Sequence, residues 1–125
     1  MITSIYKQST QGIPTYNDGY FDLYEIIQDK KSPNKENIKL IQRGYPFSEE
    51  SIGDKLKYEL KSRNIDVVKK IKCPQEKSID SLNVIAIDGN YFSVVNAYHF
   101  MDNGFSKTRL TLGKYKLIGD VIDDD

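Results

Sequence analysis

The dipeptide Asp88-Gly89 constrains this sequence most, because it separates two apolar runs, Asn83–Ile87 and Asn90–Phe100. Two residues of this type readily take the positive backbone φ angles of a type I′ turn, whose twist matches that of two antiparallel strands. We therefore predict a β-hairpin over these residues. Apolar side chains fall on both faces of its second strand, so both faces need a cover. One face carries Phe92, Val94, Tyr98 and Phe100, and the other carries Tyr91, Val95 and Ala97.

Further apolar runs, bounded by turn residues, predict additional strands. They are Ile2–Lys7, Tyr20–Ile27, Ile38–Phe47, Asp66–Cys73 and Thr108–Leu117, the third ending at Pro46 and the fourth stopped by Pro74. Several short strands around one inserted helix are typical of a small, mainly β domain. The sequence thus predicts a mainly β fold with one inserted helix, arranged as a small antiparallel β-barrel or sandwich.

The inserted helix is expected from Ser48 to about Arg63. The Ser48 hydroxyl is suited to an N-terminal cap, and the two glutamates after it suit the positive end of a helix dipole. The apolar stripe of this helix is Ile52, Leu56 and Leu60. At the 100° step of a helix, Tyr58 falls about 160° from the centre of that stripe. Tyr58 is therefore either a contact for another protein or a core residue of a helix buried on two sides.

Polar stretches between the expected strands predict exposed loops. Residues 8–19 contain many Ser, Thr, Gly, Asn and Pro residues, residues 29–37 are charged and contain Pro33, and residues 120–125 form an acidic tail that is expected to fray. The 125-residue, 14.4 kDa chain has the size of one domain. Folding a chain of this mass buries roughly two-thirds of its surface, which is enough for one core without a disulfide or a metal.

The charge balance limits the function classes. Eighteen basic and 18 acidic residues cancel, which argues against a protein whose main task is to grip phosphate backbones. No apolar run approaches the roughly 18 residues of a membrane span, so no membrane partner is expected. The first ten residues lack the pattern of a secretion signal, and a single Cys73 cannot form an internal disulfide. These features favour synthesis in the cytoplasm.

No motif for catalysis or for a cofactor stands out. His99 is three residues from Asp102, but a catalytic pair also needs a nucleophile or a substrate pocket, and nothing in the sequence activates Cys73. One Cys and one His cannot build a usual zinc site, and the run from Met101 to Thr108 lacks the first glycine of a phosphate loop. We therefore expect neither an enzyme nor a cofactor.

Binding of single-stranded nucleic acid is an alternative, because nine Tyr and five Phe residues on a small barrel could stack bases. Two observations weigh against it. The hairpin aromatics alternate with Val94 as a core face would, and the lysines are interleaved with acids such as Asp54 and Glu59.

Four segments, in order, resemble a known family. They are FSEESIGDKLKYEL (Phe47–Leu60), followed by the strand Val67–Pro74; IAIDGNYFSVV (Ile85–Val95); and TRLTL (Thr108–Leu112). This order of strand, helix with a Tyr-Glu pair, strand, Asp-Gly hairpin and closing strand is similar to that of the head-closure proteins of long-tailed bacteriophages, also called head-completion or head–tail connector proteins. The resemblance covers about Ile38 to Leu117.

The resemblance implies a structural virion protein, not an enzyme. Such a protein is a small β-barrel with one helix, and it forms a homo-oligomeric ring, expected to be a dodecamer, under the portal or adaptor ring in the virion neck. The ring closes the DNA-filled head and docks the tail-end protein, so packaged DNA is only an indirect partner. The free protein could be monomeric before assembly. It would be made in the cytoplasm of the bacterial host of a phage or prophage. A neighbouring connector or a tail-terminator ring remains an alternative.

Two sets of candidate site residues follow. The loop that would reach the channel contains Lys30, Lys31, Ser32, Pro33, Asn34 and Lys35, although these lysines could equally do no more than solvate a loop tip. The candidate ring or partner interface on the helix consists of Tyr58, Lys55, Lys57 and Lys61.

Overall fold

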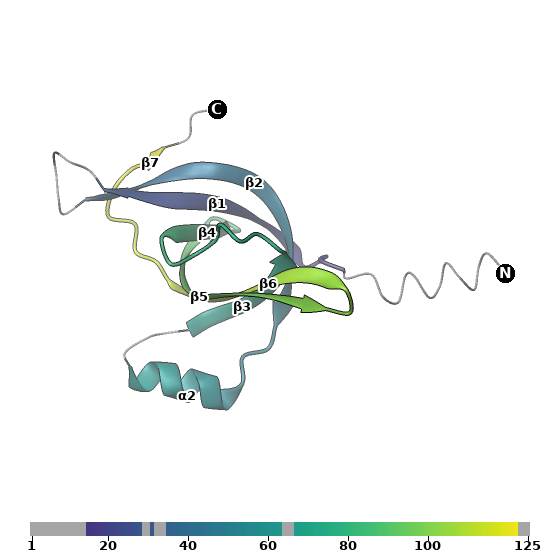
Figure 1. The fold of residues 1–125 in the computed structure, drawn as a ribbon. Coiled ribbons are helices and arrows are strands. Elements are labelled where there is room, and N and C mark those ends of the chain that lie inside the picture. The colour runs from purple at the N-terminus through teal and green to yellow at the C-terminus, as the bar shows by residue number, and fades with distance from the viewer. Residues whose placement is uncertain (1–14, 29–30, 32–34, 64–66, 123–125) are drawn as a thin grey trace, which may run out of the picture.

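The computed structural model describes residues 15–28, 31, 35–63 and 67–122 of the chain (Figure 1). Its elements are β1 (Gly19–Gln28), β2 (Glu36–Glu50), α2 (Asp54–Ser62), β3 (Val67–Pro74), β4 (Asn83–Ile87), β5 (Asn90–Asp102), β6 (Phe105–Lys114) and β7 (Val121–Ile122). The expected mainly β fold is confirmed, and α2 is the one helix within the described residues. Among the described residues, no helix is long and apolar enough to span a membrane.

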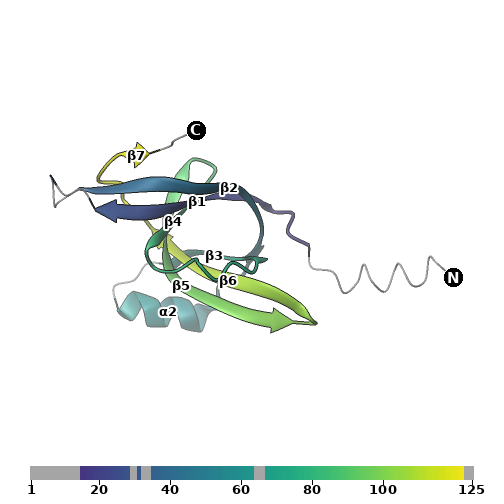
Figure 2. The same ribbon diagram turned by 45° about the horizontal axis from the view of Figure 1, so that its top comes forward.

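Six of the strands are hydrogen-bonded in a closed circuit. The order is β1-β4-β5-β6-β3-β2, and β2 pairs again with β1, while β7 lies beside β2 (Figure 2). Every pairing in the circuit is antiparallel, and β7 runs parallel to β2. The predicted Asp88-Gly89 hairpin is present: Asp88 and Gly89 have φ angles of 51° and 81°, and β4 pairs with β5 from Ile87↔Asn90 onward.

The long strand β2 closes the circuit because it changes partners along its length. Its residues up to Phe47 pair with β1, and Ser48–Glu50 pair with β3. The prediction that this strand ends at Pro46 is therefore wrong, as is the prediction that Ser48 begins the helix. The Ser48 hydroxyl donates a hydrogen bond to the carbonyl of Thr15 at 2.8 Å, and the helix begins at Asp54. Pairing with β3 keeps the backbone of residues 48–50 extended.

The interior of the circuit holds the main core. Phe21, Phe47 and Leu110 have almost no exposed surface, and Phe21 stacks on the ring of Tyr45 at 5.0 Å between centroids. Cys73 belongs to the same cluster. A second, smaller cluster centres on Ile38, Val84 and Tyr24. Burial of these apolar side chains is the main favourable contribution to folding.

A β-bulge in β5 changes which side chains face the core. Val94 pairs with Leu112 and Asn96 pairs with Thr111, so Val95 is an extra residue. After this bulge the alternation is reversed: Ala97 packs against the core, while Tyr98 is 53% exposed. The expectation that Tyr98 and Phe100 share the core face of Phe92 and Val94 is therefore wrong.

The helix α2 carries fewer core residues than expected. Ile52 precedes it and is half-buried, Leu56 is also half-buried, and the side chain of Leu60 lies outside the described part. Tyr58 is 77% exposed, so the core interpretation of this residue is wrong. The helix packs mainly near β3, at the edge of the molecule (Figure 1).

Several predicted boundaries change. The strand expected over Ile2–Lys7 and residues 8–14 of the first loop lie outside the described residues, and Gly19 already belongs to β1. Glu36 and Asn37 belong to β2 rather than to the loop at 29–37. The last long strand is Phe105–Lys114 rather than Thr108–Leu117. The tail is not frayed at Val121–Ile122, because these residues pair with Ile38 and Lys39, while residues 123–125 lie outside the described part.

Candidate interaction surface

The outer face of the β5–β6 hairpin is set by its turn. Asn103 and Gly104 both have positive φ, 52° and 82°, as a two-residue type I′ turn requires. The turn pairs Asp102 with Phe105, so Tyr98 lies opposite Arg109 and Phe100 opposite Lys107. Because side chains alternate along a strand, these four side chains leave the same face of the hairpin. We call this set, with Asp102, the hairpin outer face.

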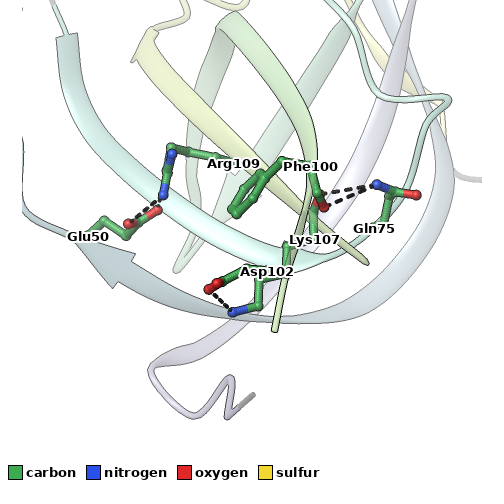
Figure 3. Close-up of polar contacts among 6 residues, drawn as sticks. All are labelled: Glu50, Gln75, Phe100, Asp102, Lys107 and Arg109. Carbon is green, nitrogen blue, oxygen red and sulfur yellow. Dashed lines mark hydrogen bonds and ion pairs between the residues drawn. The ribbon is translucent and has the colours of Figure 1, made fainter. Parts of the chain in front are cut away.

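The aromatic and cationic side chains of the hairpin outer face are held together. The rings of Tyr98 and Phe100 stack with centroids 5.2 Å apart and planes 11° from parallel. The Arg109 guanidinium lies 4.7 Å from the Phe100 ring centroid. The same guanidinium donates two hydrogen bonds to Glu50 of β2, at 2.7 and 3.3 Å (Figure 3). Arg109 therefore joins β6 to β2 across β3, and Tyr98 is left with an exposed ring.

The charges on this face stabilise one another. Partial burial alone would raise the pKa of Glu50, but the hydrogen bond and charge of Arg109 outweigh it and hold that pKa below its usual value. The hydrogen bond from Lys107, and its charge, likewise lower the pKa of Asp102. The Lys107 ammonium lies 2.9 Å from the Asp102 carboxylate, and the lysine side chain is only 8% exposed. Both acids are thus ionised at neutral pH.

The inner side of the same hairpin is tied to the connection between β3 and β4. The Thr108 hydroxyl accepts a hydrogen bond from the backbone N–H of Glu76 and lies 2.8 Å from Nδ1 of His99. The Gln75 side chain donates to the carbonyls of Phe100 and Lys107 (Figure 3). His99 thus contacts Thr108, and Asp102 contacts Lys107, so the two residues do not form the pair that their spacing suggested.

A groove of about 440 Å³ separates α2 from the sheet beside the hairpin outer face. Leu56 and Arg63 line it from the helical segment, and Lys70, Tyr98 and Arg109 line it from β3, β5 and β6. Arg109 is already bound to Glu50, so Arg63 and Lys70 supply the further positive charges among these lining residues. The groove can receive a side chain or peptide with acidic and apolar groups.

The residues predicted to form the channel loop are only partly described. Lys31 is exposed, and the Lys35 ammonium lies 3.4 Å from the Asp120 carboxylate, just before β7. Lys30 and the segment Ser32–Asn34 fall outside the described residues.

The residues predicted on the helix lie in α2, far from that loop. Tyr58, Lys55 and Lys61 are exposed, and the side chain of Lys57 is outside the described part. In both views β7 and α2 lie on opposite sides of the molecule, so the structure does not bring the two predicted sets together (Figures 1 and 2).

Sequence reasoning missed the hairpin outer face. A usable signal was present, because an Asn-Gly turn at residues 103 and 104 fixes the pairing of Tyr98 with Arg109. The bulge at Val95 has no comparable signal, and without it Tyr98 and Phe100 are assigned to the core. The contact between Glu50 and Arg109 depends on the order of β2, β3 and β6, which local patterns do not determine.

The comparisons with known proteins name no family. No protein-family model matches the chain, and no curated protein sequence matches it significantly. Within the described ranges, no group of three or more His, Cys, Asp or Glu side chains is placed to hold a metal ion.

Proposed function

We propose that this protein is a structural subunit of the neck of a tailed phage or prophage. In this role it acts as a head-closure protein: copies form a ring under the portal or adaptor ring, close the filled head and dock the tail. The proposal starts from the resemblance over about Ile38 to Leu117. The mainly β circuit of strands with one outlying helix is compatible with the small barrel and helix that this resemblance implies.

The observation that carries the proposal is the pair of unlike surfaces on the two sides of α2. Tyr58 extends into solvent, whereas Leu56, two residues earlier and about 200° around the helix, lines the groove beside the hairpin outer face. A ring needs two different patches on each subunit, because each copy meets its two neighbours through different surfaces. Exposed Tyr and Arg side chains are also the types that contribute most at protein interfaces. Tyr58 on one surface, and Tyr98 and Arg63 on the other, are side chains of these types.

The decisive experiment is genetic deletion followed by electron microscopy. We expect a phage or prophage lacking this gene to yield separate heads and tails, and the supplied protein to restore joined particles. Normal particles without the protein would reject the neck assignment. A different defect, tails of abnormal length with intact neck structures, would indicate a tail-terminator ring instead.

The Tyr58 surface gives the first specific prediction. Tyr58→Ala should abolish or strongly reduce joined particles, while the melting temperature of the free protein stays within a few degrees, because surface substitutions usually change stability by about 0.5 kcal/mol or less. The matched control is Tyr20→Ala, since Tyr20 is 69% exposed but belongs to β1. Equal loss of joining in the two variants, or unchanged joining in Tyr58→Ala, would contradict a role for Tyr58 in assembly.

A second candidate function is binding of single-stranded nucleic acid. The exposed ring of Tyr98 beside Lys70 and Arg63 favours it, because aromatic rings stack on bases and cations contact phosphates. It predicts that the affinity for a short oligonucleotide falls steeply with salt and is reduced by Tyr98→Ala. A neck subunit predicts no such binding, so fluorescence anisotropy with a labelled oligonucleotide separates the two functions.

A further inference from the structure

A second groove, with a volume of about 690 Å³, lies where β5 begins and β6 ends. Phe92 and Lys114 pair with each other across these two strands, and both line the groove. Lys116 lines it just after β6, and Val68 lines it from β3. Within the described part of the chain, it shares no lining residue with the groove beside α2. We call it the lysine groove.

The backbone after β6 places both lysines on the same side of the chain. The N–H of Tyr115 donates to the carbonyl of Tyr91 at 3.4 Å, which continues the pairing of β5 with β6 past Lys114. Tyr115 and Leu117 pack against the smaller core cluster. Because side chains alternate along an extended chain, Lys114 and Lys116 point away from that cluster, and both are exposed.

The positive charge of the lysine groove has no acidic counterpart within it. Neither lysine side chain makes a hydrogen bond or an ion pair with residues 15–28, 31, 35–63 or 67–122. No Asp or Glu of these ranges lines the groove, and Asp88 of the β4–β5 turn is not one of its lining residues. By contrast, Arg109 in the groove beside α2 is already bound to Glu50. The lysine groove therefore favours a ligand with negative charge.

The lysine groove also has an apolar part. Val68 is 42% exposed, and it lies at a bulge of β3, because the register with β6 shifts between Val67 and Lys69. The neighbouring lining residue Phe92 is 8% exposed, so its ring is fixed by the core. An apolar side chain placed beside Val68 would remove the exposed surface of this valine from water.

We propose that the lysine groove binds an acidic segment of a partner protein in an extended conformation, with carboxylates at alternate positions and an apolar side chain beside Val68. Alternate side chains of an extended segment lie on one side of it, about 6.5 Å apart, which is also the spacing expected between Lys114 and Lys116. The inference goes beyond the neck assignment and does not depend on it, since it rests on the charge and shape of this groove.

The aromatic residues of the lysine groove favour a peptide over a single-stranded nucleic acid. Bases stack on the exposed faces of aromatic rings. Phe92 is buried, and Tyr91 packs edge-on against Tyr24, with ring centroids 5.9 Å apart. The groove thus offers cations and an exposed valine rather than a stacking platform.

An NMR titration with the peptide acetyl-ESESLSESE-amide tests the proposal at low ionic strength. The peptide presents the same groups in both chain directions, with all its charges at alternate positions. We expect saturable shifts of the amides of Val68, Gly89 and Lys114–Lys116. The affinity should be about fivefold or more above that for acetyl-QSQSLSQSQ-amide, which has no charge. It should also exceed that for acetyl-SSEELEESS-amide, which has the same composition but adjacent glutamates, and it should fall as salt is added.

Substitutions in the two grooves locate the binding. Lys114→Gln and Lys116→Gln should each weaken the binding of acetyl-ESESLSESE-amide about two- to fivefold, because each removes one exposed charge pair. Val68→Ala should weaken it through the apolar contact. Lys70→Gln is the matched control, since Lys70 lines the groove beside α2, and it should leave the affinity unchanged.

Four results would overturn the proposal. The first is the absence of saturable shifts, and the second is equal affinity for the glutamate and glutamine peptides. The third is a loss of affinity in Lys70→Gln as large as that in Lys116→Gln, which would show that the peptide follows positive charge in general. The fourth is tighter binding of a single-stranded oligothymidine at Lys114 and Lys116, which would assign a nucleic-acid ligand to the groove. The joining of phage heads to tails is a separate readout, so the neck assignment can fail or hold independently.

Discussion

The two halves of β5 have the same local sequence character but different surroundings. Before the bulge at Val95, the strand has β4 on one edge and β6 on the other, and Phe92 and Val94 are buried in the core. After it, one edge is open, and Tyr98 is exposed on the hairpin outer face. One extra residue therefore separates a part of the strand that stabilises the fold from a part that presents an aromatic surface and an edge for other contacts.

The comparison teaches that aromatic content alone does not distinguish core from interface. Phe92 and Phe100 are the same residue type, eight positions apart on one strand. By simple alternation they share a face, yet the bulge places Phe92 inside and Phe100 under Arg109 on the outside. What differs is the surroundings of each ring: Phe92 belongs to the main core, whereas Phe100 contacts Tyr98 and Arg109 on the outer face.

The largest predicted effect contrasts these two phenylalanines. Phe92→Ala removes a ring that is 8% exposed, and should lower the free energy of unfolding by about 3–5 kcal/mol. Phe100→Ala loses one ring stack and one cation–π contact, and should cost about 1–2 kcal/mol. Urea unfolding curves of both variants measure the difference. Similar losses for the two variants would show that the bulge does not separate core from surface.

A second prediction tests whether reagents in solution can reach the core behind the part of β5 that follows the bulge. Cys73 pairs with Thr108, which in turn pairs with His99 in the part of β5 after the bulge. Burial, and then the charge of Glu76, raise the pKa of the Cys73 thiol to about 12. We therefore expect a thiol reagent at pH 8 to modify native Cys73 about a hundredfold or more slowly than the unfolded chain, since the thiolate is the reactive form. Rapid labelling of the native protein would show that the core behind this part of β5 is accessible to solvent.

Much of the fold was predictable because it rests on local signals. The Asp88-Gly89 turn indicated the hairpin of β4 and β5, and the apolar run of β1 and the alternation of β6 each indicated a strand that the structure contains. The errors occur where a distant partner decides. Ser48 has the composition of a helix cap, but pairing with β3 keeps it in an extended strand, and Val121 lies in a strand because β2 passes beside it. Local composition carries no information about such neighbours.

The candidate surface was less predictable than the fold. The helical period placed Tyr58 away from the apolar stripe but left it open between an exposed contact and a core residue, and the structure shows that it is exposed. The hairpin outer face needed the register at Asn103-Gly104, the position of the bulge, and the placement of Glu50 two strands away from β6. The first was readable in the sequence, the second was not, and the third required the complete order of strands.

The smallest predicted effect concerns the ion pair between Glu50 and Arg109, which holds Arg109 on the hairpin outer face. The folded state lowers the pKa of Glu50 through Arg109, in spite of partial burial, so the pair contributes stability above the unfolded pKa near 4.5. This contribution is lost as the pH falls from about that value through the lower pKa of the folded state. For a partly exposed bidentate pair we expect about 1 kcal/mol.

The test compares the unmodified protein with Glu50→Gln in urea at pH 7 and pH 3. Glu50→Gln should be less stable than the unmodified protein by about 1 kcal/mol at pH 7. This difference in the free energy of unfolding should be smaller at pH 3, because Glu50 gains a proton as the pH falls through its lowered pKa. Asp102→Asn is a useful parallel, because Asp102 pairs with Lys107 at the tip of the same hairpin. A difference in the free energy of unfolding that stays constant with pH would mean that Glu50 acts through packing rather than charge. In that case Arg109 would be held over Phe100 by the strand register alone. The part of β5 after the bulge would then be ordered by backbone pairing and packing, as the part before the bulge is.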